Sequence, residues 1–364
     1  MKNLFCFNLF IILLSLQLSY AQNNATDIPM NSSNWEIHKG TSTFETFDNK
    51  ETLLLNGKAF VKNKQFSNGT IEVDVYANKN RSFAGIIFRK QQNTMEEVYM
   101  RLHKSNQADA IQYSPTYNEE PTWQLYKEYQ ANVTFKNKGW NTLRIEVNSN
   151  TAEVFINDEK MLTLDNLRTA NNNGEIGLFS LFNNRFSNFR FTSKEVTSKE
   201  VTSKPNKETQ NKKESNLISQ WNITKAFPFI EDELSFNSFS KKKFATVTTE
   251  NSGLLPFSKF IKKPSSGNFE KNKEVYAVAS TSIESNNNQV RLFSFDYSDK
   301  IIVYLNGTAI FSGNNAFRSK GLQYQGHIDI NANKLYLNLK KGKNTLHCAV
   351  IDKANGWGLI GKLE

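Results

Sequence analysis

A chain of 364 residues is long enough for two domains, and only one of its two cysteines, Cys348, lies outside the first 21 residues. One cysteine cannot form an internal disulfide bond, so the fold must be stabilised by its hydrophobic cores. The formal net charge of +10 would suit an anionic partner. The lysines are scattered or lie in one polar segment, which disfavours a nucleic-acid groove.

The first 21 residues have the composition of a secretory signal peptide. Lys2 precedes an apolar stretch from Leu4 to Leu18, and small residues follow at Ser19 and Ala21. This stretch is shorter than the ~20 residues that span a bilayer. We therefore expect cleavage after Ala21 and a secreted, periplasmic or cell-surface protein with no membrane span. Export argues further against nucleic acid, and an anionic polysaccharide stays open as a partner.

Residues 29–193 contain recurrent short runs in which apolar and polar residues alternate, and Asn, Gly and Asp separate the runs. Examples are Gly69–Tyr76, Asn141–Val147 and Ala152–Asn157. No amphipathic helix of useful length is visible between them. Many short strands in one segment predict two packed antiparallel sheets, a β-sandwich.

The run from Glu97 to His103 carries the candidate site. Side chains of a strand alternate between its faces, so Val98, Met100 and Leu102 are expected in the core, with the remaining side chains on the opposite face. The residues expected to bind a ligand there are Arg89, Tyr99, Arg101, His103, Gln112, Tyr113, Trp123 and Tyr126. A plain solvated face would show the same alternation. The abundance of Tyr, Arg, His and Trp favours a ligand over that alternative.

The sequence does not contain a complete set of glycosidase catalytic residues in these strands. A retaining glycosidase needs two carboxylates roughly 5 to 5.5 Å apart, but the strand that carries Glu72 and Asp74 lacks the further glutamate. Glu97 and His103 are the remaining candidates for a general base. Six positions along one extended strand would separate them by about 20 Å, too far for a single proton-transfer pair.

Several of these runs together resemble a known family. They are Gly85–Arg89, Val98–His103, Asp109–Pro115, Trp123–Tyr126 and Gly139–Val147, with Gly174–Phe179 and Phe186–Phe191 as closing strands. This set is similar to the concanavalin A-like (laminin G-like) domain of the 3-keto-disaccharide hydrolase, or family-16-hydrolase-like, type. The resemblance extends from Trp35 to Phe191. It implies a β-sandwich and, as the alternative to pure binding, cleavage of oligosaccharides or keto-sugar derivatives.

Residues 194–215 are rich in Lys, Glu, Ser and Thr and contain no aromatic residue, so we expect a disordered linker. Strand-like runs return in residues 216–364, where Asn306-Gly307 is a typical hairpin turn. The order of Tyr304–Gly307 and Leu339–Leu346 resembles a galactose-binding-like jelly roll. We therefore predict a second β-sandwich, with Cys348 buried in it.

The sequence thus predicts an all-β fold of two β-sandwich (jelly-roll) domains joined by a low-complexity linker. The four histidines are scattered and show no metal-binding spacing, so no cofactor is predicted. A structural Ca²⁺ bound by backbone carbonyls would leave no sequence signal and stays open. The predicted function is exported, non-catalytic carbohydrate binding; a hydrolase or lyase and a structural or adhesive protein are the alternatives. The sugar and the oligomeric state are not specified.

Overall fold

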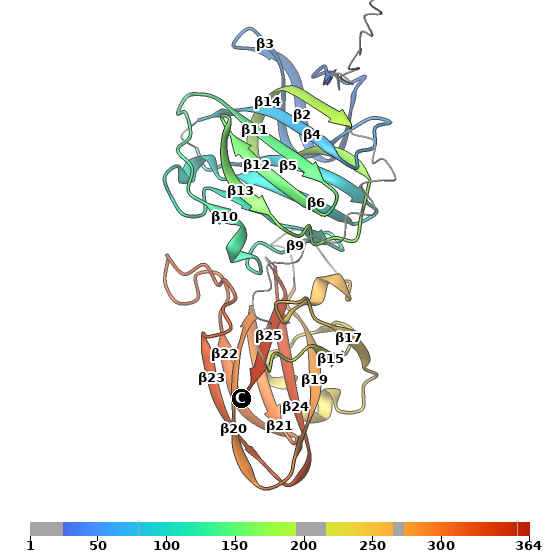
Figure 1. Ribbon diagram of the computed structural model, residues 1–364, viewed down its shortest axis with the longest axis vertical. Helices are drawn as coiled ribbons and strands as arrows, with labels where there is room; N and C mark the ends of the chain where they lie inside the picture. Colours follow the sequence, from blue (N-terminus) through green and yellow to red (C-terminus); the bar gives the residue numbers. More distant parts are fainter. Residues whose placement is uncertain (1–24, 79, 194–215, 265–272, 355) are drawn as a thin grey trace, which may run out of the picture.

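The computed structural model describes residues 25–78, 80–193, 216–264, 273–354 and 356–364. Two β-sandwiches follow one another along the long axis of the molecule, the first built from residues up to 193 and the second from residue 216 onward (Figure 1). The predicted all-β fold of two sandwiches is confirmed. The expected signal peptide and the expected linker lie outside the described residues.

The first domain contains fourteen strands and two short 3₁₀ helices among the described residues. The strands are β1 (Thr26–Ile28), β2 (Trp35–Phe47), β3 (Lys50–Val61), β4 (Gly69–Ala77), β5 (Phe83–Gln91), β6 (Thr94–Met100), β7 (Ile111–Tyr113), β8 (Thr116–Tyr117), β9 (Glu120–Pro121), β10 (Gln130–Ala131), β11 (Gly139–Asn148), β12 (Thr151–Ile156), β13 (Glu159–Leu164) and β14 (Glu175–Ser193). The 3₁₀ helices are η1 (Leu102–Lys104) and η2 (Lys127–Tyr129).

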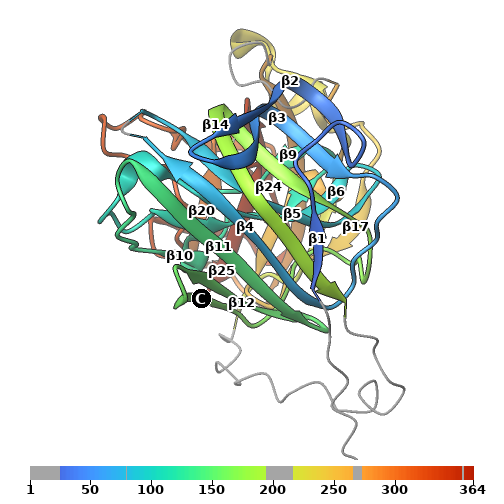
Figure 2. The ribbon, with the colours of Figure 1, turned by 90° about the horizontal axis from the view of Figure 1, so that it is seen from above.

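Strand β14 is shared by the two sheets of this sandwich, and Figure 2 shows it crossing the domain beside β3 and β4. Its first half pairs with β5 and β3, and its second half pairs with β4, β3 and β1. The pairing with β3 shifts between Ser180 and Asn184, and such an irregularity lets a strand bend from one sheet into the other. The first sheet therefore runs β2-β3-β14-β5-β6-β7-β10, and the second contains β14-β4-β11-β12-β13.

The core of the first domain lies between these two sheets because one side chain in two points inward. Val98 and Met100 of β6 belong to the same buried cluster as Val73 and Val75 of β4. Burying a side chain of this size contributes about 1.5–3 kcal/mol, so the cluster holds the two sheets together without a disulfide bond. The other face of the first sheet, here called the outer face, carries the candidate site.

The second domain has two sheets, ordered β17-β15-β19-β24-β21-β22 and β18-β25-β20-β23, with β16 paired to β19. Its strands are β15 (Gln220–Ile223), β16 (Phe227–Pro228), β17 (Ala245–Thr248), β18 (Leu254–Pro256), β19 (Val275–Ser285), β20 (Gln289–Ser298), β21 (Lys300–Leu305), β22 (Thr308–Asn314), β23 (Asn333–Leu339), β24 (Gly342–Asp352) and β25 (Gly358–Leu363). Its helices are η3 (Glu231–Glu233), α1 (Phe236–Phe239) and η4 (Phe257–Lys259). Asn306 and Gly307 adopt positive φ between β21 and β22, as the sequence predicts, and Cys348 is buried.

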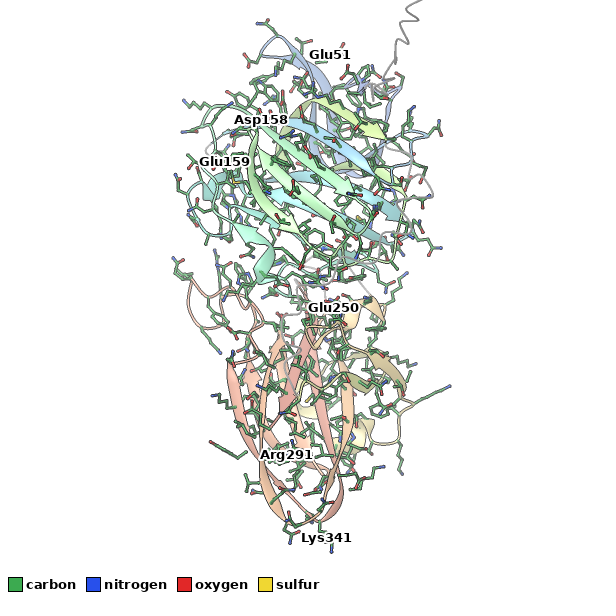
Figure 3. All side chains as sticks on the ribbon, in the orientation of Figure 1. Glu51, Asp158, Glu159, Glu250, Arg291 and Lys341 are labelled. Atoms are coloured by element: carbon green, nitrogen blue, oxygen red, sulfur yellow. The ribbon has the colours of Figure 1, made fainter. Side chains whose placement is uncertain are left out.

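The two domains contact each other through polar side chains. Gln124 of the first domain donates from Nε2 to the Gln325 carbonyl at 2.9 Å and accepts at Oε1 from the Ser298 hydroxyl at 3.2 Å. The Tyr126 hydroxyl donates to Glu250 Oε1 at 2.9 Å, and Figure 3 shows Glu250 at the junction of the domains. In the part of the chain that the structure describes, no helix is long and apolar enough to cross a membrane.

Candidate functional site

The outer face of the first sheet has an apolar floor. The pleat of β6 places Met95, Glu97 and Tyr99 on this face, because Val98 and Met100 between and after them point into the core. A small cluster forms the floor around them; its members are Phe60, Ile87 and Met95, with the half-buried Phe179 packed against them. A charged group on this floor is surrounded by carbon atoms rather than by water.

Glu97 is the titratable group in that position. The residue is 5% exposed, and within the described part of the chain its carboxyl group makes no hydrogen bond and no ion pair. Burial raises the pKa of Glu97 from its ordinary value to about 7, although the positive charge of Lys58 opposes the rise. Near neutral pH this carboxyl group can therefore either accept or donate a proton.

Tyr99, Arg101 and Gln112 form one buried hydrogen-bond network beside Glu97. The Tyr99 hydroxyl donates to Gln112 Oε1 at 3.1 Å, and Arg101 Nη2 donates to the same Oε1 at 2.6 Å. Arg101 Nη2 also donates to the Tyr99 hydroxyl oxygen at 3.1 Å. Burial raises the pKa of Tyr99 to about 12, so its hydroxyl keeps the proton that it donates.

This network fixes the position of Trp123. Gln112 Nε2 donates to the Trp123 carbonyl oxygen at 2.6 Å, and the Arg101 guanidinium lies 5.6 Å from the centre of the Trp123 ring. Arg101 is in turn anchored to Asp109, donating to its carbonyl oxygen at 2.8 Å. Arg101 and Gln112 thus form their hydrogen bonds within the protein. Together they position the Trp123 ring, which is half-exposed.

Gly85 allows Tyr99 to lie where it does. Gly85 is paired with Tyr99 across β5 and β6. A Cβ atom on Gly85 would lie 2.2 Å from the Val98 carbonyl oxygen and 2.6 Å from the Tyr99 Cβ atom. Real Cβ atoms do not approach so closely, so any larger residue here would displace Tyr99 and, through it, the network.

His103 lies at the edge of the outer face, not on β6. The predicted strand from Glu97 to His103 is too long, because β6 ends at Met100 and the chain continues into η1. The His103 ring lies 5.2 Å from Phe83, and its Nδ1 lies 3.0 Å from the Ser82 carbonyl oxygen. Burial lowers the pKa of His103, so the ring is neutral at neutral pH.

Arg89 is not on the outer face, so its predicted position is wrong. The pairing of β5 with β6 shifts between Phe88 and Gln91, and Arg89 has a φ of 51° there. This irregularity breaks the alternation on which the prediction depended. The Arg89 guanidinium instead donates to the Ser67 carbonyl oxygen at 2.6 Å and to the Ser149 carbonyl oxygen at 2.7 Å.

Tyr113 and Tyr126 are also placed away from the outer face. Tyr113 follows Gln112 directly and therefore points to the opposite side of β7, into the core, where its hydroxyl donates to Glu96 Oε2 at 2.6 Å. Tyr126 is fully buried and donates to Glu250 of the second domain. Neither ring is available as a platform for a sugar. The structure thus brings together Tyr99, Arg101, Gln112 and Trp123 and separates the other two tyrosines from them.

Residues 27–192 match the family model of the 3-keto-alpha-glucoside-1,2-lyase-like domain. The first domain is of the concanavalin A-like, 3-keto-disaccharide hydrolase type. This agrees with the resemblance derived from its strand sequences. No curated protein sequence matches the chain.

Solved structures of carbohydrate-active proteins are similar to a part of this chain. The carbohydrate-binding module CBM66 from Bacillus subtilis is 12% identical; the match covers 44% of this chain and 92% of that chain, with a TM-score of 0.32. Bacillus licheniformis β-glucanase is 13% identical over 47% and 98% of the two chains, with a TM-score of 0.34. Domain 4 of AbnA, an arabinanase from Geobacillus stearothermophilus solved with arabinotriose, is 11% identical over 49% and 85%, with a TM-score of 0.31.

The second domain contributes two rings to the surroundings of Trp123 that the sequence did not indicate. Phe317 and His327 meet the Trp123 ring edge-on, with ring centres 5.6 and 5.7 Å away. They lie in the segment between β22 and β23, which extends toward the 3-keto-disaccharide-hydrolase-type domain in Figure 1. They lie 194 and 204 residues after Trp123 in the sequence, and no local pattern encodes such a contact.

Metal ligands are not grouped in the described parts of either domain. Among the described residues, no set of three or more His, Cys, Asp or Glu side chains is placed to hold a metal ion. The polar groups of the outer face are the Glu97 carboxyl, the Lys58 ammonium and the network that holds Trp123.

Proposed function

We propose that the protein binds a carbohydrate on the outer face of its first domain, with Trp123 as the stacking platform and Glu97 as a polar contact. The single observation that carries this proposal is the Trp123 ring, half-exposed and held by Arg101 and Gln112 on the face that bears Glu97. Sugars present apolar C–H faces that pack on aromatic rings while their hydroxyl groups bond to polar side chains. Tyr99, Arg101 and Gln112 then act by positioning Trp123.

Exposed apolar side chains extend this face on the side of Phe83. Phe83 lies 6.2 Å from Tyr99 and 6.1 Å from Phe182, and Phe182 is 48% exposed. The Arg81 guanidinium lies over both phenylalanine rings, at 5.7 and 5.4 Å. A contiguous row of rings with a cation at its end can accommodate more than one sugar unit, which favours an oligosaccharide over a monosaccharide.

The test is a binding titration of the full chain with a panel of oligosaccharides that includes a 3-keto-disaccharide. Trp123→Ala should lower the affinity at least tenfold, because stacked rings at the centre of a binding surface dominate its energy. Trp140→Ala is the matched control, since Trp140 is also partly exposed but lies on β11 of the other sheet. Equal affinities of the Trp123→Ala variant and the wild-type protein would refute carbohydrate binding at this face.

A second candidate function, proton transfer in sugar cleavage, rests on Glu97 alone. A carboxyl group with a pKa of about 7 and no hydrogen-bond partner among the described residues is suited to act as a general base or acid, as a hydrolase or lyase requires. Glu97→Gln should then lower the rate of product release by a factor of about 100 or more, while the oligosaccharide still binds. Glu72→Gln, on the second sheet and paired with Arg190, should keep full activity.

The same proposal includes export, so that the protein meets extracellular glycans. The first 21 residues have the composition of a signal peptide, and Ala21 is the expected last residue removed. Amino-terminal sequencing of the mature protein from its native host should start at Gln22. A mature chain that retains Met1 would contradict export by this route.

A further inference from the structure

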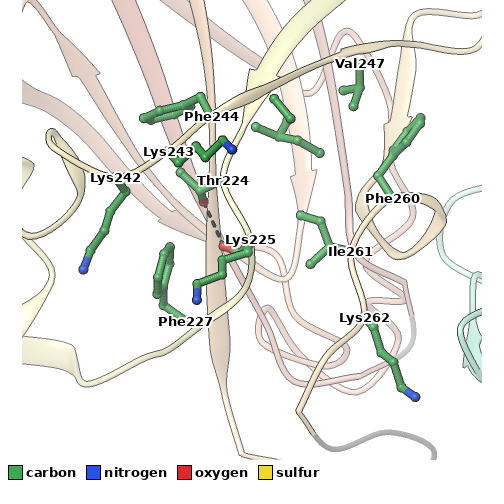
Figure 4. Close-up of a pocket in the computed structure, with 12 residues that line it drawn as sticks. Thr224, Lys225, Phe227, Lys242, Lys243, Phe244, Val247, Phe260, Ile261 and Lys262 are labelled. Atoms are coloured by element: carbon green, nitrogen blue, oxygen red, sulfur yellow. Dashed lines mark hydrogen bonds between the residues drawn. The ribbon is translucent and has the colours of Figure 1, made fainter.

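The second domain has a hollow of about 640 Å³ that no part of the proposed sugar site uses. It is open to solvent beside the edge strand β17, and its floor includes the buried Ile223 and Ile261. Four lysines contribute to its lining: Lys225, Lys242, Lys243 and Lys262. Figure 4 shows Lys225, Lys242 and Phe227 together on one side of it, with Phe260 and Lys262 on the other.

The charge of this hollow is one-sided. No aspartate or glutamate is among its lining residues, and within the described part of the chain none of the four ammonium groups forms an ion pair. Two of them are also close to one ring, because Lys225 Nζ and Lys242 Nζ lie 5.7 and 5.2 Å from the centre of Phe227. Like charges that share one site repel each other, and a bound anion would relieve this repulsion.

The hollow also offers ring surface. Phe227 and Phe244 are half-buried, and Phe260 is 40% exposed. Phenylalanine side chains are usually buried, so the exposure of Phe260 is unusual. Aromatic faces beside cations suit a ligand that combines apolar C–H surface with negative charge. An acidic sugar has both properties, whereas a simple inorganic anion would leave the rings unused.

We propose that this hollow binds an acidic polysaccharide, a chain of sugars that carries carboxylate or sulfate groups. Lys225, Lys242 and Lys243 neutralise the acidic groups, and Phe227 packs against a sugar ring. The residues of β17 are mostly exposed and the strand lies at the edge of its sheet, so the hollow beside it is accessible to a segment of a polymer. A flat anionic membrane would contact the outermost lysines but would not fill a recess that extends down to Ile261.

The test compares two probes with the same backbone, dextran sulfate and uncharged dextran, binding to the full chain; polygalacturonate adds a carboxylate probe. Dextran sulfate and polygalacturonate should bind and dextran should not, and affinity should fall as salt rises. Lys225→Ala with Lys242→Ala should lower the affinity at least tenfold, and Phe227→Leu should lower it severalfold. These lysines are exposed, so the variants should keep the wild-type melting temperature.

The control is Lys340→Ala with Lys341→Ala, which removes two adjacent exposed lysines. Lys341 lies at the end of the second domain farthest from the first domain (Figure 3). This double variant should change the affinity less than twofold. An equal loss in both double variants would show that only overall charge matters and would overturn the proposal. Preferential binding to anionic phospholipid vesicles over dextran sulfate would also overturn it. Trp123→Ala tests the first domain separately, so the two proposals can fail independently.

Discussion

The rings of Trp123 and His327 lie 5.7 Å apart at an interplanar angle of 86°, although they belong to different domains. His327 is held in this position by Gln130, whose Nε2 lies 3.0 Å from His327 Nε2. Burial lowers the pKa of His327 to about 4, with help from the charge of Arg101, so the ring is neutral and can accept from the Gln130 amide. The second domain therefore helps to fix the ring on which the proposed sugar site depends.

The first prediction follows from this contact. Replacing both Phe317 and His327 by alanine should lower oligosaccharide affinity by about fivefold or more, because edge-on aromatic pairs contribute about 0.5–1.5 kcal/mol each. Leu322→Ala is the matched control, since Leu322 lies in the same segment between β22 and β23 but is 76% exposed. Isothermal titration of the full-length variants measures the effect. If the double variant binds as tightly as Leu322→Ala, the second domain has no part in the site.

The second prediction concerns Glu97 and pH. Because burial raises its pKa to about 7, the folded state favours the protonated carboxyl group more than the unfolded chain does. The stability that this group contributes is therefore complete below the ordinary pKa near 4.5 and is lost as pH rises through about 7. Glu97→Gln, which imitates the protonated form, should be more stable than the wild-type protein at pH 8, by up to about 3 kcal/mol.

Urea unfolding of both proteins at pH 4.5 and at pH 8 measures this difference. The two free energies should agree at the lower pH and diverge at the higher one. Glu153→Gln provides the control, because this side chain is 44% exposed on β12 and should give no pH-dependent gain. A gain in Glu97→Gln that is the same at both pH values would show that repacking, not ionisation, stabilises the variant.

Apart from the contact between Trp123 and His327, a buried ion cluster around Lys263 also joins the two domains. Lys263 Nζ lies 3.0 Å from Glu120 Oε2 of the first domain and forms an ion pair with Asp352 of β24. Lys263 and Glu120 are 4% and 3% exposed, and Asp352 is fully buried. Burial alone would lower the pKa of Lys263, but the Asp352 and Glu120 carboxylates raise it, so the lysine stays charged. Removing this cation would deprive the buried Asp352 carboxylate of its ion-pair partner.

The third prediction is that Lys263→Met destabilises the protein by about 3–5 kcal/mol, the usual effect of breaking a buried ion pair from one side. Chemical denaturation at neutral pH provides the measurement. The neighbouring Lys262 is exposed, so Lys262→Ala should change the unfolding free energy by less than about 0.5 kcal/mol. A loss below 1 kcal/mol in Lys263→Met would mean that water or the neighbouring carboxyl groups relax to replace the cation.

The sequence predicted the parts of this structure that depend on local patterns. The Asn306-Gly307 turn and the alternation that brings Tyr99 to the outer face both follow from neighbouring residues, and both are present. The partners of Trp123 could not be predicted, because Phe317 and His327 approach it only after the domains assemble. The linker composition gave no sign that the domains would contact each other. The position of Arg89 was predicted wrongly because the pairing of β5 with β6 is irregular between Phe88 and Gln91, which reverses the alternation of side chains. No glycine or proline in the sequence marks this irregularity.

The fourth prediction tests that placement of Arg89. Arg89 is 3% exposed and its guanidinium connects Ser67, Asn68 and Ser149, so Arg89→Ala removes charge-assisted hydrogen bonds to all three. We expect a loss of about 2–4 kcal/mol in unfolding free energy, with unchanged oligosaccharide affinity in the fraction that folds. The control is Arg190→Ala, because the Arg190 side chain is 51% exposed where it pairs with Glu72. This substitution should lower the free energy of unfolding by less than about 1 kcal/mol. A folded Arg89→Ala protein with normal stability and reduced affinity would return Arg89 to the binding site and contradict its structural role.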